Sequence, residues 1–121
     1  MPALGDLEAQ VMRKIWARAQ PATVRDIVSE LERERPIAYT TVMTVMDNLR
    51  KKGWLRRQAD GRAYRYEPLV SGEEYSAGLI RQALEASHDQ PAVLMHFIEK
   101  LSAEEAAALE EAYRRLTGNT P

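Results

Sequence analysis

The chain has 121 residues, 45% of them hydrophobic and 29% charged, the composition of an ordinary globular protein with room for one domain and an appendage. It has no cysteine, which excludes disulfides and thiolate metal sites; with no leader and no run near the roughly 20 apolar residues of a membrane span, we expect a cytoplasmic protein. The net charge is −1, but residues 1–70 carry +4 and residues 71–121 carry −5, which predicts separate roles for the two parts.

Three helices are predicted in the first part of the chain. Apolar side chains at helical spacing predict the first helix from about Ala3 to Ala17. Thr23 and Asp26 form a variant capping box that begins the second helix, and Pro36 is expected to end it. The third helix is expected from Thr40 to Gly53, since glycine is common just past a helix C-terminus.

The third predicted helix has one apolar and one polar side. Its apolar stripe consists of Val42, Val45, Met46 and Leu49. An ordinary surface helix also has a polar side, but threonine is a mediocre helix former, so three exposed threonines indicate contact with a polar partner. The major groove of DNA admits one α-helix, whose hydroxyl and amide groups read base edges. The residues of this helix expected to contact DNA are Thr40, Thr41, Thr44, Asn48 and Lys51.

Side-chain chemistry predicts individual roles on this helix. Asn48 is suited to paired hydrogen bonds with adenine, and Lys51 to phosphate or guanine. Asp47 would repel phosphate, so we expect it either to accept a hydrogen bond from cytosine or to pair with Lys51 one turn later.

A β-hairpin is predicted directly after the third helix. Trp54–Gln58 and Ala63–Glu67 have the composition of short strands, and Asp60-Gly61 between them is a strong hairpin signal. Residues 50–65 hold seven cations and one anion, a density suited to phosphate binding. The hairpin tyrosines expected in the core, packed on the first helix, are Tyr64 and Tyr66. The arginines expected to contact the DNA backbone or the minor groove are Arg56, Arg57, Arg62 and Arg65.

Three helices followed by a hairpin are the order of a winged helix-turn-helix domain, which we place at residues 1–70. From Ser71 onward the sequence predicts helices, with capping boxes at Ser71–Glu74 and Ser102–Glu105. The expected fold is therefore mainly α with a small β-hairpin, and residues 71–121 form a second, helical region.

The helices of this second region have apolar stripes that short helices cannot bury alone. They either pack on the N-terminal domain or pair with a second chain. We favour a homodimer, because helix-turn-helix proteins commonly bind palindromic DNA with two-fold symmetry. The residues expected at the dimer interface are Tyr75, Leu79, Leu94, Phe97, Ile98, Leu101, Leu109, Tyr113 and Leu116.

Other classes of function find little support in the sequence. His88 and His96 lack a metal-binding spacing, so no metal and no other cofactor is expected. No nucleophile elbow, phosphate loop or zinc-protease motif is present, so we do not expect an enzyme. A winged helix used for protein contact is an alternative, against which the exposed threonines and the local cations argue.

Several motifs resemble the penicillinase-repressor family of the BlaI/MecI type, which is related to the copper-responsive CopY-type repressors. They extend over almost the whole chain. The matching residues are Leu4-Gly5-x-Leu7-Glu8, Val11-Met12, Trp16, Tyr39-Thr40-Thr41-Val42-Met43-Thr44, Leu49-x-x-Lys52-Gly53 and Arg62-x-Tyr64-x-Tyr66-x-Pro68.

The resemblance implies a winged-helix domain, a C-terminal helical dimerisation region and repression at palindromic operators near β-lactamase genes. It also implies a membrane β-lactam sensor that triggers cleavage of the repressor. The family commonly has Arg or Lys at the position of Asn48, so the half-site sequence stays open. The family's cleaved bond is typically Asn-Phe, and His96-Phe97 stands at the matching place. The cysteines of the copper-responsive branch are absent, so we do not expect derepression by a metal. A repressor of an unrelated regulon is the alternative to a β-lactam role.

Overall fold

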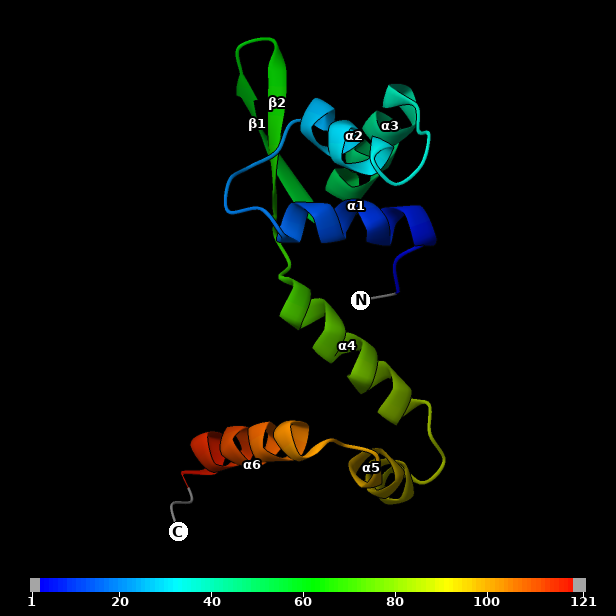
Figure 1. The fold of residues 1–121 in the computed structure, drawn as a ribbon, viewed down its shortest axis with the longest axis vertical. Helices are drawn as coiled ribbons and strands as arrows, with labels where there is room; N and C mark the ends of the chain where they lie inside the picture. Colours follow the sequence, from blue (N-terminus) through cyan, green and yellow to red (C-terminus); the bar gives the residue numbers. More distant parts are fainter. Residues whose placement is uncertain (1–2, 119–121) are drawn as a thin grey trace. The chain divides into compact units, whose positions relative to one another are not determined.

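The structure, a computed structural model, describes residues 3–118 and divides the chain into two compact units, one up to Leu79 and one from Ile80 onward. Within residues 3–118 there are six helices and one antiparallel hairpin (Figure 1), which confirms the expected mainly α class. In chain order these elements are α1 (Asp6–Trp16), α2 (Val24–Glu32), α3 (Tyr39–Lys51), β1 (Leu55–Asp60), β2 (Ala63–Pro68), α4 (Gly72–Glu85), α5 (Gln90–Glu99) and α6 (Ala103–Thr117). No helix in the described part of the chain is long and apolar enough to cross a membrane.

One hydrophobic core holds the first unit together. Figure 1 shows α1 lying across the α2–α3 pair, with the hairpin beside α2. The three helices contact one another, and α1 and α3 also contact the strands. Each helix turns its apolar stripe inward, and the start of the hairpin closes the core. The buried hydrophobic residues are Val11, Met12, Ile15, Ala22, Val24, Ile27, Val28, Leu31, Val42, Met46, Leu49, Trp54, Leu55 and Tyr66.

The ends of the first two helices differ from the sequence prediction. α1 begins at Asp6 rather than at Ala3, because extended Gly5 is its N-cap and donates its backbone N–H to Glu8 Oε1 at 3.0 Å. α2 ends at Glu32, before Pro36. The chain after Glu32 tightens into a turn, in which the backbone N–H groups of residues 34 and 35 both donate to the Leu31 carbonyl.

Two glycines with positive φ set the ends of α3 and of the hairpin. Gly53 follows α3 with φ +87°, which confirms the predicted C-terminal glycine. Gly61, with φ +64°, is the first residue of the two-residue loop between paired Asp60 and Ala63. Arg62 is not in the positive-φ region, so the loop has the pattern of a type II′ turn.

A short backbone bridge ties the hairpin to the segment between α1 and α2. Ala22 N–H donates to the Tyr66 carbonyl at 2.9 Å, and Tyr66 N–H donates to the Ala22 carbonyl at 2.8 Å. The sequence did not predict that Ala22 would pair with β2. The bridge fixes the base of the hairpin against the start of α2.

The first turns of α4 belong to the first unit. Tyr75 packs between Trp16 and Trp54, with ring centroids 5.7 and 5.3 Å away, and its hydroxyl accepts the Leu4 N–H at 3.0 Å. Trp16 Nε1 donates to the Val70 carbonyl at 2.7 Å. These contacts extend the unit to Leu79 rather than to residue 70, and they give Tyr75, an expected dimer residue, partners within its own chain.

The second unit has capped helices, and its described residues, 80–118, form no buried core. Asp89 caps α5 by accepting the Ala92 N–H, and Ser102 caps α6 in a reciprocal pair with Glu105. Among the described residues, none in α5 or α6 is buried. The large exposed apolar residues from Ile80 onward are Ile80, Val93, Leu94, Met95, Phe97, Ile98, Leu109, Tyr113 and Leu116.

Candidate nucleic-acid interface

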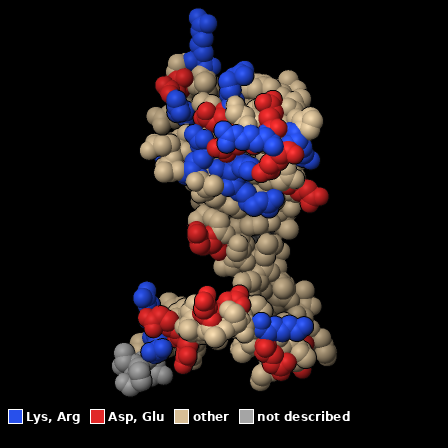
Figure 2. Space-filling view, in the orientation of Figure 1, with Lys and Arg blue, Asp and Glu red and all other residues tan. Residues whose placement is uncertain are grey.

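A groove of about 880 Å³ lies in the first unit between α3, the start of α2 and one face of the hairpin. Among the described residues that line it, five are cations and one is a carboxylate. Its polar and aromatic lining consists of Thr23, Arg25, Tyr39, Thr44, Asp47, Asn48, Arg50, Lys51, Arg57, Arg62, Tyr64 and Tyr66. Figure 2 shows Lys and Arg side chains gathered over the first unit, with acidic side chains among them.

The polar side of α3 forms one wall of this groove. Thr44, Asn48 and Lys51 line it on successive turns, because residues three or four positions apart share a helix face. Thr40 and Thr41 are exposed on the first turn of α3 but do not line the groove. The structure therefore brings together three of the five helix residues predicted from the sequence.

Asp47 lies at the junction of α3 and the hairpin and contacts three cations. Its Oδ1 accepts from Arg50 Nη2 at 2.8 Å and lies 3.4 Å from Arg57 Nη1, and its Oδ2 lies 3.2 Å from Lys51 Nζ. The hydrogen bond from Arg50, followed by that from Lys51, holds the pKa of the Asp47 carboxyl below its ordinary value. Asp47 is therefore charged at neutral pH, and the predicted pair with Lys51 is confirmed.

Tyr64 and Tyr66 share a strand face but have different surroundings. Tyr66 is 2% exposed and belongs to the core, whereas Tyr64 is 45% exposed, so its predicted place in the core is wrong. Tyr64 lies nearer the hairpin tip, and its ring stacks against the Arg57 guanidinium at 3.9 Å. The Tyr66 side chain is the main cause that raises the pKa of Arg57, which stays charged.

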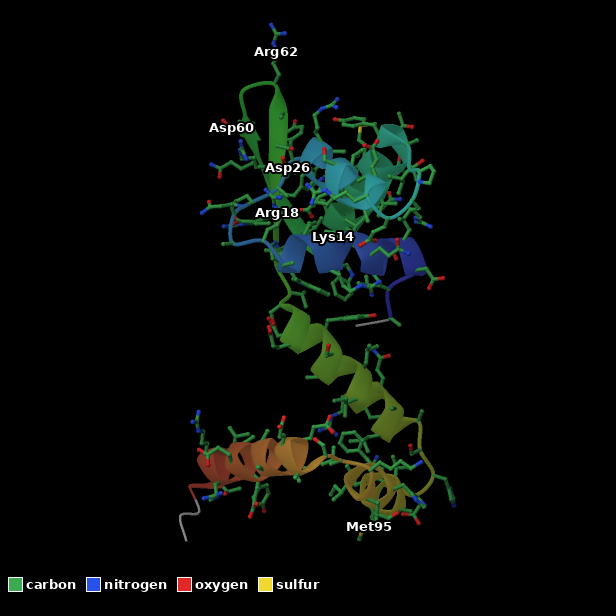
Figure 3. All side chains as sticks on the ribbon, in the orientation of Figure 1. Lys14, Arg18, Asp26, Asp60, Arg62 and Met95 are labelled. Atoms are coloured by element: carbon green, nitrogen blue, oxygen red, sulfur yellow. The ribbon has the colours of Figure 1, made fainter. Side chains whose placement is uncertain are left out.

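The four predicted hairpin arginines divide between two faces and the tip. Arg57 lines the groove, and Arg62 lines it from the tip, where Figure 3 shows it pointing away from the strands. Arg56 and Arg65 lie on the opposite face, since side chains alternate along a strand. They pair there with carboxylates, Arg56 with Glu67 and Arg65 with Asp60. Asp60 also raises the pKa of Arg65 through this hydrogen bond.

Residues 4–115 match the family model described as penicillinase repressor. The chain belongs to the penicillinase repressor family. It is 44% identical to the transcriptional regulator BlaI of Mycobacterium tuberculosis, over 98% of this chain and 90% of that protein. It is 26% identical to the methicillin resistance regulatory protein MecI of Mammaliicoccus sciuri, over 80% of each chain.

Solved structures agree with this membership. The DNA-binding domain of the repressor BlaI, solved in solution, matches with a TM-score of 0.54 and 28% identity, over 61% of this chain and 89% of that one. The Bacillus licheniformis BlaI monomer in complex with the blaP half-operator matches over the same shares, with a TM-score of 0.52 and 28% identity. The transcriptional regulator Tm0710 of Thermotoga maritima, with a TM-score of 0.55 and 20% identity, shares the fold alone.

The first unit is accordingly a winged-helix domain, as the sequence predicted, and the hairpin is its wing. The chain is a DNA-binding transcriptional repressor of the BlaI/MecI type rather than an enzyme.

Sequence reasoning missed two of the five groove cations of this penicillinase repressor, Arg25 and Arg50. Arg25 lies on the first turn of α2, with its guanidinium 5.2 Å from the Tyr39 ring centroid. Arg50 follows Asn48 by two positions and reaches the groove through Asp47. Arg50 belongs to the basic run that the sequence shows, whereas no local pattern indicates that Arg25 meets α3.

The described residues 3–118 contain no group of three or more His, Asp or Glu side chains placed to hold a metal ion. His96 lies 3.8 Å from Glu99 on the same helix, and its side chain is 79% exposed. The groove itself is lined by cations, hydroxyls and the amide of Asn48, which suit a nucleic-acid backbone and base edges.

Proposed function

We propose that this repressor binds palindromic operator DNA as a homodimer in the cytoplasm, with α3 in the major groove and the wing against the flanking backbone. The observation that carries the proposal is the groove in which the polar side of α3 meets Arg57 and Arg62 of the wing. We further propose that its targets are genes of β-lactam resistance, as the names of two relatives, a penicillinase repressor and a methicillin resistance regulatory protein, suggest.

Base reading is assigned to the polar side of α3. Thr44 and Asn48 are exposed and line the groove, and their hydroxyl and amide groups are suited to base edges. Thr40 and Thr41, on the first turn, are placed where helices that enter a major groove commonly contact bases. Support comes from Bacillus licheniformis BlaI, which was solved with a half-operator.

Phosphate contacts are assigned to Lys51, Arg57 and Arg62. Lys51 has a side chain that is 63% exposed, and Arg62 extends past the turn of the wing (Figure 3). Arg56 and Arg65 face away from the groove and are paired with carboxylates, so they contribute to DNA binding only by exchanging those partners. Their assignment as DNA contacts is the weaker part of the sequence prediction.

The dimer is assigned to the second unit. Leu94, Phe97, Ile98, Leu109 and Tyr113 are each 41–66% exposed, and an apolar surface of this kind is stabilised by a second copy. Two half-sites about 34 Å apart, or a multiple of that distance, suit a two-fold dimer. The same proposal includes Leu101 and Leu116 of the second unit, whereas Tyr75 and Leu79 belong to the winged-helix unit.

Derepression is assigned to loss of the dimer, triggered by a membrane β-lactam sensor system. His96 and Phe97 are both exposed, yet they lie inside α5, so cleavage between them requires that this helix unwinds locally. One protomer on one half-site keeps only part of the contacts, and its release from DNA follows by mass action.

A gel shift on the region upstream of the chain's own operon tests the proposal. The wild type should shift a duplex with two half-sites at far lower concentration than a duplex with one, and mixed-sequence competitor should not reverse the shift. Absence of any shift at low salt would contradict the assignment. Binding to a selected operator that lies far from β-lactamase genes would instead support the alternative, a repressor of an unrelated regulon.

A further inference from the structure

Asp47 is the one carboxylate among the described residues that line the groove, and it restrains three of the five cations there. Its contacts are with Arg50 at 2.8 Å, Lys51 at 3.2 Å and Arg57 at 3.4 Å. Arg57 is also stacked on Tyr64, so its guanidinium is fixed from two sides. Three of the five groove cations are therefore held by Asp47, whereas Arg25 and Arg62 are not.

The stability of α3 does not explain an acid at this position. Asp47 lies one turn before the C-terminal end of the helix, where the helix dipole disfavours an anion. Its side chain is 31% exposed, and surface ion pairs at a spacing of three or four residues contribute little to stability. In a surface that binds phosphate, an anion also reduces the attraction for every duplex.

We propose that Asp47 is a specificity-determining residue, which holds Arg50, Lys51 and Arg57 in one arrangement and so disfavours DNA whose phosphates do not fit that arrangement. The inference rests on the proposed DNA-binding function and deepens it. Binding to mixed-sequence DNA depends on phosphate attraction and on cations that adapt to any backbone. At an operator, the held cations contact phosphates without losing further side-chain entropy. This partly compensates for the affinity that the negative charge of Asp47 removes.

The geometry leaves the held cations able to contact DNA. Arg57 meets Asp47 through Nη1, and a guanidinium has five N–H donors in a planar fork. Arg57 can thus donate to a phosphate while it stays on Asp47. Asp47 acts as a positioning group for these cations, whereas Thr44 and Asn48 keep the base contacts.

The test compares Asp47→Asn with the wild type on two probes of about 30 base pairs, near three helical turns each. One probe has mixed sequence, and the other is the duplex that the wild type selects in vitro. We expect Asp47→Asn to bind the mixed-sequence probe about tenfold more tightly than the wild type does, with a salt slope steeper by about one. Its gain in affinity for the selected duplex should be smaller. Asp47→Ser, which lacks the amide donors, should show the same pattern.

Glu34→Gln is the matched control, because it removes one negative charge and breaks one lysine pair, with Lys14, outside the groove. Its binding to both probes should stay within about twofold of the wild type. Two results, in variants that melt like the wild type, would overturn this inference and leave the proposed function standing. One is an equal gain in affinity for both probes, and the other is no gain for the mixed-sequence probe. A wild type that binds neither probe at low salt would overturn the proposed function together with this inference.

Discussion

Single side chains on the wing have roles that depend on which strand face they occupy. Arg56 and Arg57 are neighbours in the chain, yet Arg56 pairs with Glu67 on one face while Arg57 stacks on Tyr64 on the other. The basic run of the sequence predicted phosphate contact for both. Only the register of the hairpin, which pairs Arg57 with Tyr66, separates them.

Arg62→Ala should weaken binding to all duplexes alike and flatten the salt slope by about one, because it removes one phosphate contact. Arg56→Ala is the matched control and should change the slope far less, since its guanidinium is paired with Glu67 away from the groove. Fluorescence anisotropy over a salt series measures both. If Arg56→Ala flattened the slope as much as Arg62→Ala, the division of the wing into two faces would not hold in the complex.

Asn48→Ala should lose about 1–3 kcal/mol of discrimination at one base pair, because a paired hydrogen bond to one base is removed. Competition by operators with single base changes measures this loss. Lys51→Ala is the comparison, since loss of a phosphate contact should weaken binding to all these single-change operators by a similar factor. A uniform loss for Asn48→Ala would assign Asn48 to the backbone and leave base reading to the threonines.

Elements built from local patterns were predictable, and contacts between distant segments were not. The helical period of α3, Gly53 at its end and the turn at Gly61 depend on neighbouring residues, and the structure agrees with them. The bridge between Ala22 and Tyr66 depends on how separate segments meet, which no local period encodes. The same reason explains why Arg25 was missed and why Tyr64 was wrongly placed in the core.

The N-terminal cap of α2 should make stability depend on acid pH. The Thr23 backbone N–H donates to Asp26 at 2.9 Å and is the main cause that holds the pKa of Asp26 below its ordinary value. A folded-state pKa below the unfolded one gives stabilisation that is present above about pH 4 and is lost as the pH falls through the folded-state pKa.

Asp26→Asn should therefore lower the free energy of unfolding by about 1 kcal/mol at pH 7, and by less at pH 3, where the wild type has lost part of the contribution. Urea unfolding at the two pH values measures the difference. A loss of the same size at both pH values would show that the carboxylate charge is not what stabilises the cap.

At the scale of the whole molecule, charge and apolar surface are divided between the two units. Cations gather on the winged-helix unit (Figure 2), whereas the second unit exposes the apolar side chains of α5 and α6. The sequence indicated this division through the opposite net charges of its two parts. It placed the boundary at residue 70, because the packing of Tyr75 against two tryptophans has no local signature.

Phe97→Asp should convert the proposed dimer into a monomer, because a charge at an apolar interface has no partner and must stay hydrated. Sedimentation velocity should show the change in mass. Binding to a duplex with two half-sites should fall strongly, while binding to a single half-site stays near that of the wild type. Lys100→Gln, an exposed change next to α5, is the control, and a Phe97→Asp protein that remains dimeric would place the interface elsewhere.

The backbone bridge between Ala22 and Tyr66 divides the wing into two parts whose amide protons should exchange at different rates. The amide protons of these residues are tied into the core and should exchange with deuterium only in rare openings of the domain, whereas the amide of Arg62 should exchange fast. The segment around the turn therefore lies outside the core, whereas the bridged end of the wing is part of it. Changes in the charge of this segment should therefore alter DNA affinity while the buried core of the domain stays the same.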